Sequence, residues 1–205
     1  TLMRLSNNTH LALVDLECTC SNTNAGDNTV RRDDMETIEI GAVMVRRHDF
    51  EPLDEFEAFA RPVVHRELTD FCIELTSITQ HDVDAAPRFP EVYWRFKDWL
   101  WAWQADAWGS WGNFDAYQLA LDAKRHGIQH EMADLPAHVN VKKWWAKQMG
   151  MKRVGLGRAV QTAGLEFAGR AHRGIDDARM VARLLPGVGW PERPQGAAIR
   201  PGFED

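Results

Sequence analysis

The order of apolar segments predicts an α/β fold with a mixed five-stranded sheet flanked by helices. Three strand-like segments with short connections open the chain, and helices alternate with two further strands behind them. The opening segments predict an antiparallel meander, and the later alternation predicts parallel strands beside it. With 205 residues and a 44% share of hydrophobic residues, the chain has room for one well-packed domain.

The strands are expected where apolar residues form short runs or alternate with polar ones. LALVDLE, residues 11–17, is an apolar run that ends in acidic residues, which is typical of a central strand. β-Branched residues at 36–47 and clean alternation at 54–62 predict the second and third strands. The fourth and fifth are expected at 105–112 and 138–141.

The helices are expected from helical spacing and from their end signals. Pro90 fits the first turn of one helix, Gly127 the end of a second, and Asp176 the cap of the last. The expected helical segments are short pieces between 69 and 80, then 89–103, 113–127, a basic helix after 141, a short helix within 155–165, and 176–185. We expect residues 1–187 to form a single domain and the Pro- and Gly-rich residues 188–205 to form a peripheral tail.

The apolar runs and the cysteines of the chain predict its location in the cell. No apolar run approaches the roughly 18 residues that cross a bilayer, so we expect no membrane contact. Cys18, Cys20 and Cys72 form an odd and sparse set, which fits a reducing compartment better than a disulfide framework. The expected location is therefore the cytoplasm.

Positive charge is concentrated in one segment of this acidic chain. The net charge of -6 argues against a nucleic-acid partner, because affinity for phosphates comes mainly from Lys and Arg. Residues 135–165 nevertheless contain no Asp or Glu. The cations of this segment are Lys142, Lys143, Lys147, Lys152, Arg153 and Arg158. Taken alone, the segment fits a solvated helix face and a phosphate-binding surface equally well.

Two acidic pairs with the same spacing differ in their context. Asp15 and Glu17 end an apolar strand, on which residues two apart point to the same side. Asp34 and Glu36 have the same spacing but lie in a polar loop. Carboxylates clustered at a strand end repel one another unless a cation lies among them, and a hard divalent ion suits oxygen ligands. Asp15 and Glu17 are therefore the candidate metal ligands.

Three further residues are candidates for the same site only because of their order along the chain. Asp115 lies just inside a helix start, where an Asp commonly compensates the helix dipole. Asp177 has the same alternative explanation and follows Asp176 directly. His172, five positions before Asp177 on a turn, favours Asp177 over its neighbour, because an imidazole there can reach a metal-bound water.

The combined pattern of D-x-E, a distant D at a helix start and H-x₄-D resembles the DEDDh (DnaQ-like) branch of the DEDD superfamily of 3′-to-5′ exonucleases. The segment RPVVHRELTDFCIELTSITQHDVDAAPRFPEV, residues 61–92, is similar to a block of the Eri-type exoribonucleases. AGRAHRGIDDARMVARLL, residues 168–185, is similar to their third motif. The resemblance covers residues 11–185.

This resemblance implies an RNase H-like fold and a two-metal-ion mechanism with Mg²⁺ or Mn²⁺. By similarity, Asp15, Glu17 and Asp177 hold one ion, and Asp15 and a substrate phosphate hold the second. Asp115 supports the second ion directly or through water, and His172 takes a proton from the attacking water. The implied reaction releases nucleoside 5′-monophosphates from the 3′ end of a single-stranded nucleic acid, with RNA favoured.

Expected substrate contacts come from two segments. Phe71, Leu75, Thr76 and Ile78 lie in or beside the block that contacts the terminal base and sugar in similar enzymes, although core packing explains each apolar residue as well. Lys142 and Lys143 are expected to bind phosphates.

Two departures from the family pattern could alter the fit of the 3′ end. Ser77 stands where the similar block often has Gly, and the 18–35 loop is long and polar.

Two other functions remain as alternatives. The same five residues serve DNA exonucleases of the proofreading or Trex type, since RNA preference depends on contacts to the 2′-hydroxyl. A non-catalytic nucleic-acid-binding module is less well supported, because all five candidate positions are occupied by suitable residues. The sequence does not identify a protein partner.

Overall fold

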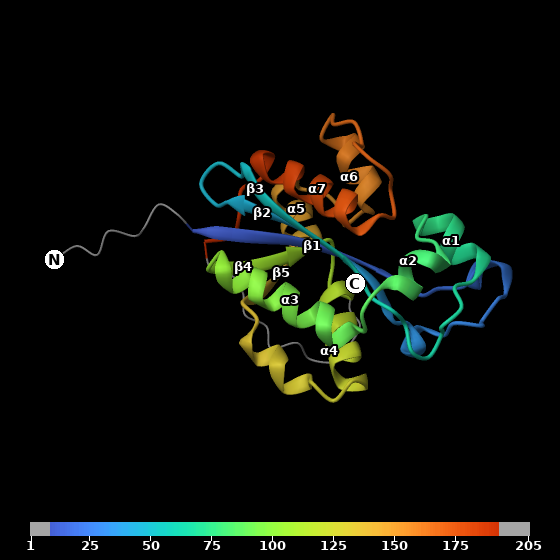
Figure 1. Cartoon of the computed structure of the whole chain (residues 1–205). Helices are drawn as coiled ribbons and strands as arrows, with labels where there is room; N and C mark the ends of the chain where they lie inside the picture. The colour runs from blue at the N-terminus through green and yellow to red at the C-terminus, as the bar shows by residue number, and fades with distance from the viewer. Residues whose placement is uncertain (1–8, 193–205) are drawn as a thin grey trace.

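In the computed structural model, which describes residues 9–192, a twisted five-stranded sheet separates two layers of helices (Figure 1). The strand order is β3-β2-β1-β4-β5. β1 pairs antiparallel with β2 and β2 with β3, whereas β4 lies parallel to both β1 and β5. The strands are β1 (His10–Cys18), β2 (Thr37–Arg46), β3 (Pro52–Phe59), β4 (Ala105–Ser110) and β5 (Ala137–Asn140). The expected meander with added parallel strands is confirmed.

Seven α-helices lie around this sheet within the described range. They are α1 (Asp70–Thr76), α2 (Gln80–Ala85), α3 (Phe89–Ala102), α4 (Phe114–Arg125), α5 (Val141–Gln148), α6 (Leu156–Thr162) and α7 (Gly174–Leu184). α3 and α4 cover one face of the sheet, α5, α6 and α7 lie on the other, and α1 and α2 lie beyond the ends of β1 and β2 (Figure 1). Among residues 9–192, no helix has the length and apolar character that a membrane span requires.

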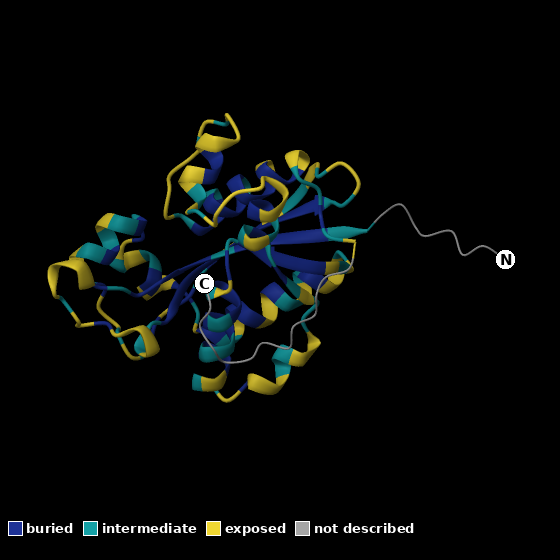
Figure 2. Cartoon of the chain, turned by 180° about the vertical axis from the view of Figure 1, so that it is seen from behind, coloured by how far each residue is buried: buried dark blue, intermediate teal, exposed yellow. Residues whose placement is uncertain are grey.

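Both faces of the central strands are buried, as the apolar run in β1 predicts (Figure 2). Ala12 and Val14 of β1 face α3 and α4, whereas Leu11 and Leu13 face α7. The alternation follows from the two-residue period of a strand. The sheet therefore holds β1 rigidly up to the carboxylates at its end.

The start of α7 differs from the prediction. The helix begins at Gly174 with Arg173 as its N-cap residue, so Asp176 lies inside the first turn and does not cap it. The Asp176 carboxylate instead accepts a hydrogen bond from the Arg170 backbone N–H at 2.9 Å and pairs with Arg179 at 2.7 Å. Asp176 therefore binds the loop before the helix and Arg179, whereas Asp177 faces the sheet.

The segment after α7 also differs from the expected peripheral tail. Trp190 is only 8% exposed and packs in the core with α7 and β4. Its ring and Val141 occupy the space beside Gly109, so a side chain at Gly109 would collide with them. The first part of the expected tail therefore belongs to the fold, and residues 193–205 lie outside the described residues.

Candidate active site

The ends of β1 and β4 bring three of the predicted carboxylates together. β1 carries Asp15 and Glu17 near its C-terminal end, and Asp115 lies in the first turn of α4, which follows the parallel strand β4. The backbone N–H of Leu16 donates to Asp115 Oδ1 at 3.0 Å, between the two acidic residues of β1. Asp115 is therefore linked to the strand itself, as well as lying near its carboxylates.

A contact between two glycines brings the fourth carboxylate to this end of the sheet. α7 begins against β2 so closely that a Cβ built on Gly41 would lie 2.1 Å from the Gly174 carbonyl carbon. A Cβ on Gly174 would lie 2.9 Å from the Asp15 backbone oxygen. Only glycine fits such a backbone approach. The first turn of α7, with Asp177, therefore lies directly against β1.

The H-x₄-D motif closes the site. Ligand atoms of Glu17, His172 and Asp177 all lie within 4.8 Å of one another. The backbone N–H of His172 donates to Asp177 Oδ2 at 3.2 Å, and the residue has a left-handed backbone with φ of 64°. His172 is exposed, whereas Glu17 and Asp177 are buried. The imidazole thus lies at the solvent side of the carboxylates.

The clustered acids of this site raise one another's pKa values. Burial, followed by the nearby carboxylates of Asp115 and Glu17, raises the pKa of Asp15 well above its ordinary value. Burial and the Asp177 carboxylate raise the pKa of Glu17 in the same way. Burial raises the pKa of Asp177 to about 7, against the opposing effect of the His172 N–H. Like charges crowded in this manner favour a bound cation or a shared proton.

The donor set fits a divalent metal ion. Asp177 Oδ1 is buried and has no hydrogen-bond partner among the described residues, which is costly for a carboxylate oxygen. Carboxylate oxygens from Asp15, Glu17 and Asp177 are the ligands that Mg²⁺ and Mn²⁺ prefer. Asp115 would support the same site from the Leu16 side.

The second acidic pair has a structural role, as its loop context predicts. Glu36 is buried, and its two carboxylate oxygens accept backbone hydrogen bonds from Val63, Val64 and His65 at 2.7 to 3.1 Å. Asp34 pairs with Arg31 at the surface. Neither carboxylate belongs to the candidate site.

Comparison with known proteins now decides the family. The family model described as exonuclease matches residues 13–185, which include all five candidate residues. The chain belongs to the exonuclease family. Human 3'-5' exoribonuclease 1 is 30% identical over 188 residues, which are 85% of this chain and 51% of the human protein. The chain spans about half the length of the curated relatives that it matches first.

Two solved structures support the same family branch. The nuclease domain of 3'hExo, a DEDDh family member bound to rAMP, is 27% identical with a TM-score of 0.73, covering 89% of this chain and 92% of that one. A 3'-exonuclease solved in 3'-end specific recognition of a histone mRNA stem-loop is 25% identical with a TM-score of 0.73, covering 89% and 64%. The expected DEDDh, Eri-type relationship and the RNase H-like fold are confirmed.

On the exonuclease fold, α1 lies beside the carboxylates but presents only part of its predicted substrate surface. Phe71 and Leu75, one helical turn apart, remain partly exposed, so their predicted contacts with the terminal nucleotide stand as predictions. Ile78 is 0% exposed and packs in a core cluster with Cys72. Thr76 is also buried, and its hydroxyl donates to the Cys72 carbonyl and accepts from the Ile78 N–H. In this fold the two side chains are engaged in core packing and local hydrogen bonds, and their predicted substrate contacts stay predictions.

The departure at Ser77 has a local structural cost. Ser77 ends α1 in the left-handed region with φ of 61°, where glycine adopts the conformation without steric penalty. We expect Ser77→Gly to raise the free energy of unfolding by about 0.5 to 1 kcal/mol, because the strain relieved exceeds the added chain entropy. Urea denaturation measures the difference. Ser77→Ala, which keeps the Cβ, is the control, and equal stability of the Gly and Ala variants would contradict the strain argument.

Glu39 holds the H-x₄-D loop, although no motif in the sequence includes this residue. Glu39 lies opposite Glu17 in the β1–β2 register and is 0% exposed. Its Oε2 accepts from the Gly174 N–H at 3.1 Å and pairs with Arg173 Nε at 3.2 Å, and Arg173 also pairs with Glu57. Burial raises the pKa of Glu39, whereas Arg173 lowers it. An acid inside the buried strand TIEIGAV was the available signal, since such a charge requires a partner.

Loss of Glu39 is expected to affect turnover more than substrate binding. Glu39→Gln retains an acceptor for the Gly174 N–H but loses the ion pair, whereas Glu39→Ala loses both. We expect kcat to fall by about 100-fold for the Ala variant and less for Gln, because small displacements of catalytic groups have effects of this size. KM should remain unchanged in both. Glu57→Gln removes only the outer partner of Arg173 and is the control; equal losses in all three variants would contradict a positioning role.

The raised pKa of Asp177 predicts a coupling between pH and metal binding. Between the ordinary Asp value near 4 and about 7, the folded protein retains a proton that the unfolded chain has lost. The Asp177 contribution to stability of the metal-free protein should therefore fall as pH rises through this window. Because metal binding displaces the proton, Mn²⁺ affinity should rise with pH through this window.

Two measurements check this coupling. The difference in free energy of unfolding between the natural chain and Asp177→Asn, measured in EDTA against pH, reports the Asp177 contribution together with its coupling to Asp15 and Glu17. Isothermal titration with Mn²⁺ across the same range gives the affinity. Metal affinity that is independent of pH between about 5.5 and 7 would contradict the prediction.

Proposed function

We propose that this chain is a 3′-to-5′ exonuclease that hydrolyses single-stranded RNA and releases nucleoside 5′-monophosphates. The observation that carries the proposal is the convergence of Glu17, His172 and Asp177, whose ligand atoms lie within 4.8 Å of one another. Asp15 lies close enough for the Glu17 and Asp177 carboxylates to raise its pKa. The choice of RNA is supported by relatives named exoribonucleases and by the related 3'-exonuclease that recognises a histone mRNA stem-loop at its 3' end.

The four carboxylates have different proposed roles, which follow from their positions in the fold. Asp15, Glu17 and Asp177 would hold the divalent cofactor, for which we propose two Mg²⁺ or Mn²⁺ ions. A bound divalent ion supplies positive charge where phosphodiester cleavage develops negative charge. Asp115 fixes the end of β1 through the Leu16 N–H and so keeps the spacing of the carboxylates.

His172 accepts the proton of the attacking water at a ring nitrogen. The hydrogen bond from its backbone to Asp177 fixes the residue, while its exposed ring can exchange the proton with solvent. Water attacks phosphorus, the bond to the 3′ oxygen of the preceding nucleotide breaks, and that oxygen takes a proton. A shortened RNA with a free 3′-hydroxyl and a nucleoside 5′-monophosphate result.

Digestion of matched RNA and DNA oligomers tests the proposal. With a 5′ label and Mg²⁺ or Mn²⁺, we expect a ladder of shortened RNA that reports removal from the 3′ end, and slower loss of DNA. Equal or faster DNA degradation would favour the DNA exonuclease alternative, since the same carboxylates serve both polymers. Binding of RNA without any release of mononucleotides would favour a non-catalytic module.

The cytoplasm is the location that we propose. Cys18, Cys20 and Cys72 are free thiols in the fold, as expected in a reducing compartment. Fractionation of cells that express a tagged chain tests the location, and recovery in an oxidising compartment would overturn it.

A further inference from the structure

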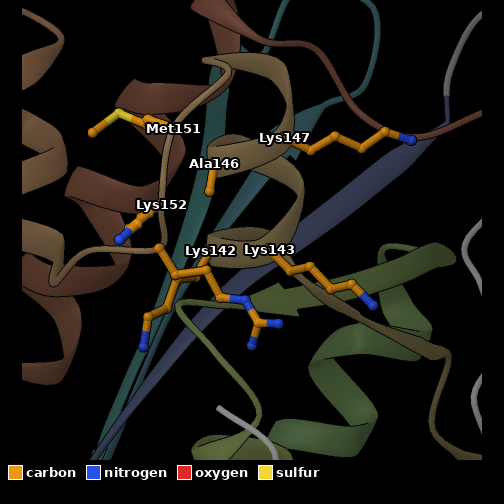
Figure 3. A pocket seen from close by; sticks show the side chains of 7 residues that line it. Lys142, Lys143, Ala146, Lys147, Met151 and Lys152 are labelled. Carbon is orange, nitrogen blue, oxygen red and sulfur yellow. The ribbon is translucent and has the colours of Figure 1, made fainter.

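A basic hollow lies on α5 and the turn that follows it. Its volume is about 540 Å³, and five of its seven lining residues carry a positive charge. The lining residues are Lys142, Lys143, Ala146, Lys147, Met151, Lys152 and Arg153. Lys143 and Lys147, one helical turn apart, extend in the same direction from α5 (Figure 3). A hollow of this size can take a phosphate together with part of its nucleotide.

The hollow adjoins the turn that leads to the candidate active site. Asn140, which caps α5, donates through Nδ2 to Asn113 Oδ1 at 3.0 Å, and Asn113 caps α4. Trp111 Nε1 donates to the Val154 carbonyl at 3.0 Å, directly after the last lining residue. Both bonds join residues that flank the hollow to the β4–α4 turn, at Asn113 and Trp111, which lie two and four residues before Asp115. The hollow and the carboxylates therefore share one end of the sheet.

The cations of the hollow have no acidic partner in the fold. Within residues 9–192, none of the five forms an ion pair within 4.0 Å with an Asp or Glu. Lys147 lies 6.0 Å from the centre of the Trp144 ring. Elsewhere Lys97, Arg125, Arg173 and Arg179 are each paired with carboxylates. A polyanion with closely spaced charges would supply the missing counter-charge.

We propose that this hollow is a second RNA-binding site, which holds backbone phosphates on the 5′ side of the nucleotides at the carboxylates. The inference rests on the proposed exoribonuclease function and extends it to the body of the substrate. Continuity with the β4–α4 turn favours RNA over an unrelated anionic partner, because a strand leaving the active site can follow this end of the sheet. Apolar contacts from Ala146 and Met151 suit a ribose or base without selecting its sequence. The site therefore favours long substrates over short ones.

Neutralisation of three exposed cations tests the proposal. The variant is Lys143→Gln, Lys147→Gln and Lys152→Gln, and the matched control is Arg88→Gln, Arg95→Gln and Lys124→Gln. The control residues are equally exposed and belong to the α3 and α4 side of the sheet. Binding of a long unstructured RNA is measured by fluorescence anisotropy in EDTA, so that no cleavage occurs. Cleavage of the same RNA and of a dinucleotide is measured separately, and thermal unfolding confirms that both variants fold.

The expected result is selective. The hollow variant should bind the long RNA at least about tenfold more weakly and lose about 2 from the slope of log affinity against log salt. KM for the long RNA should rise, whereas cleavage of the dinucleotide and all properties of the control should stay unchanged.

Other outcomes separate the two proposals. Equal RNA affinity in the variant and the control would overturn the hollow as a binding site while leaving the exonuclease proposal intact. Loss of binding to vesicles containing phosphoinositides, with RNA binding unchanged, would also overturn it. If the hollow variant binds RNA more weakly than the natural chain but the natural chain cleaves neither substrate, the result would support the hollow as an RNA-binding site and overturn the exonuclease proposal.

Discussion

Replacement of Asp15 by Asn is expected to abolish nuclease activity, lowering kcat by at least about a thousandfold. Charge stabilisation at a metal site contributes several kcal/mol to catalysis, and each 1.4 kcal/mol corresponds to about a factor of ten in rate. Asp15 is central because its carboxylate interacts with Asp115, Glu17 and Asp177 together. Release of mononucleotides from RNA in Mg²⁺ and in Mn²⁺ measures the loss.

The same substitution should not destabilise the metal-free protein. Because burial and four neighbouring acids raise the pKa of Asp15, a neutral side chain there removes an unfavourable charge. We therefore expect an equal or higher Tm in EDTA and a smaller rise in Tm when Mn²⁺ is added. Asp34→Asn changes the acid of the second D-x-E pair and should leave activity unchanged. Full activity of Asp15→Asn would remove the basis of the site.

Most of the fold follows from local patterns in the sequence. The apolar run at β1 predicts a strand that is buried on both faces. The alternation at β3 predicts a strand with one buried and one exposed face. Helix ends were less predictable. α7 starts at Gly174 because of a contact with Gly41, which is 133 positions earlier, and no local signal for that contact exists.

The site shows the same division between local and distant determinants. Asp15 and Glu17 could be placed from strand spacing alone, and His172 then distinguished Asp177 from Asp176. Ile78 lies in a motif resembling a substrate-binding block, yet its neighbours in space make it a core residue. Glu39 belongs to the site only through a loop 134 positions later in the chain, so its partners required the tertiary structure. Side-chain burial and contacts between residues far apart in the chain are thus the features of the site that the spacing of residues does not predict.

Replacement of Gly41 by Ala should uncouple α7 from the sheet. The new Cβ would lie 2.1 Å from backbone atoms of Gly174 and Ile175, so neither element can yield by rotating a side chain. We expect a loss of about 2 to 4 kcal/mol in the free energy of unfolding, at or above the usual cost of overpacking. We also expect loss of Mn²⁺ binding, because the first turn of α7 carries Asp177 to the other carboxylates.

A second glycine variant separates this effect from the general cost of replacing glycine. Gly157 lies in α6 with no atom within 4 Å of a built Cβ, so Gly157→Ala should leave activity unchanged and stabilise the protein by up to about 1 kcal/mol. Urea denaturation gives the stabilities, and titration with Mn²⁺ gives the metal affinity. If Gly41→Ala bound Mn²⁺ and cleaved RNA as the natural chain does, the close approach of α7 to β2 would not be what assembles the site. We expect Gly41→Ala to lose Mn²⁺ binding and Gly157→Ala to keep it, which would show that the metal site requires the backbone contact of Gly41 with Gly174.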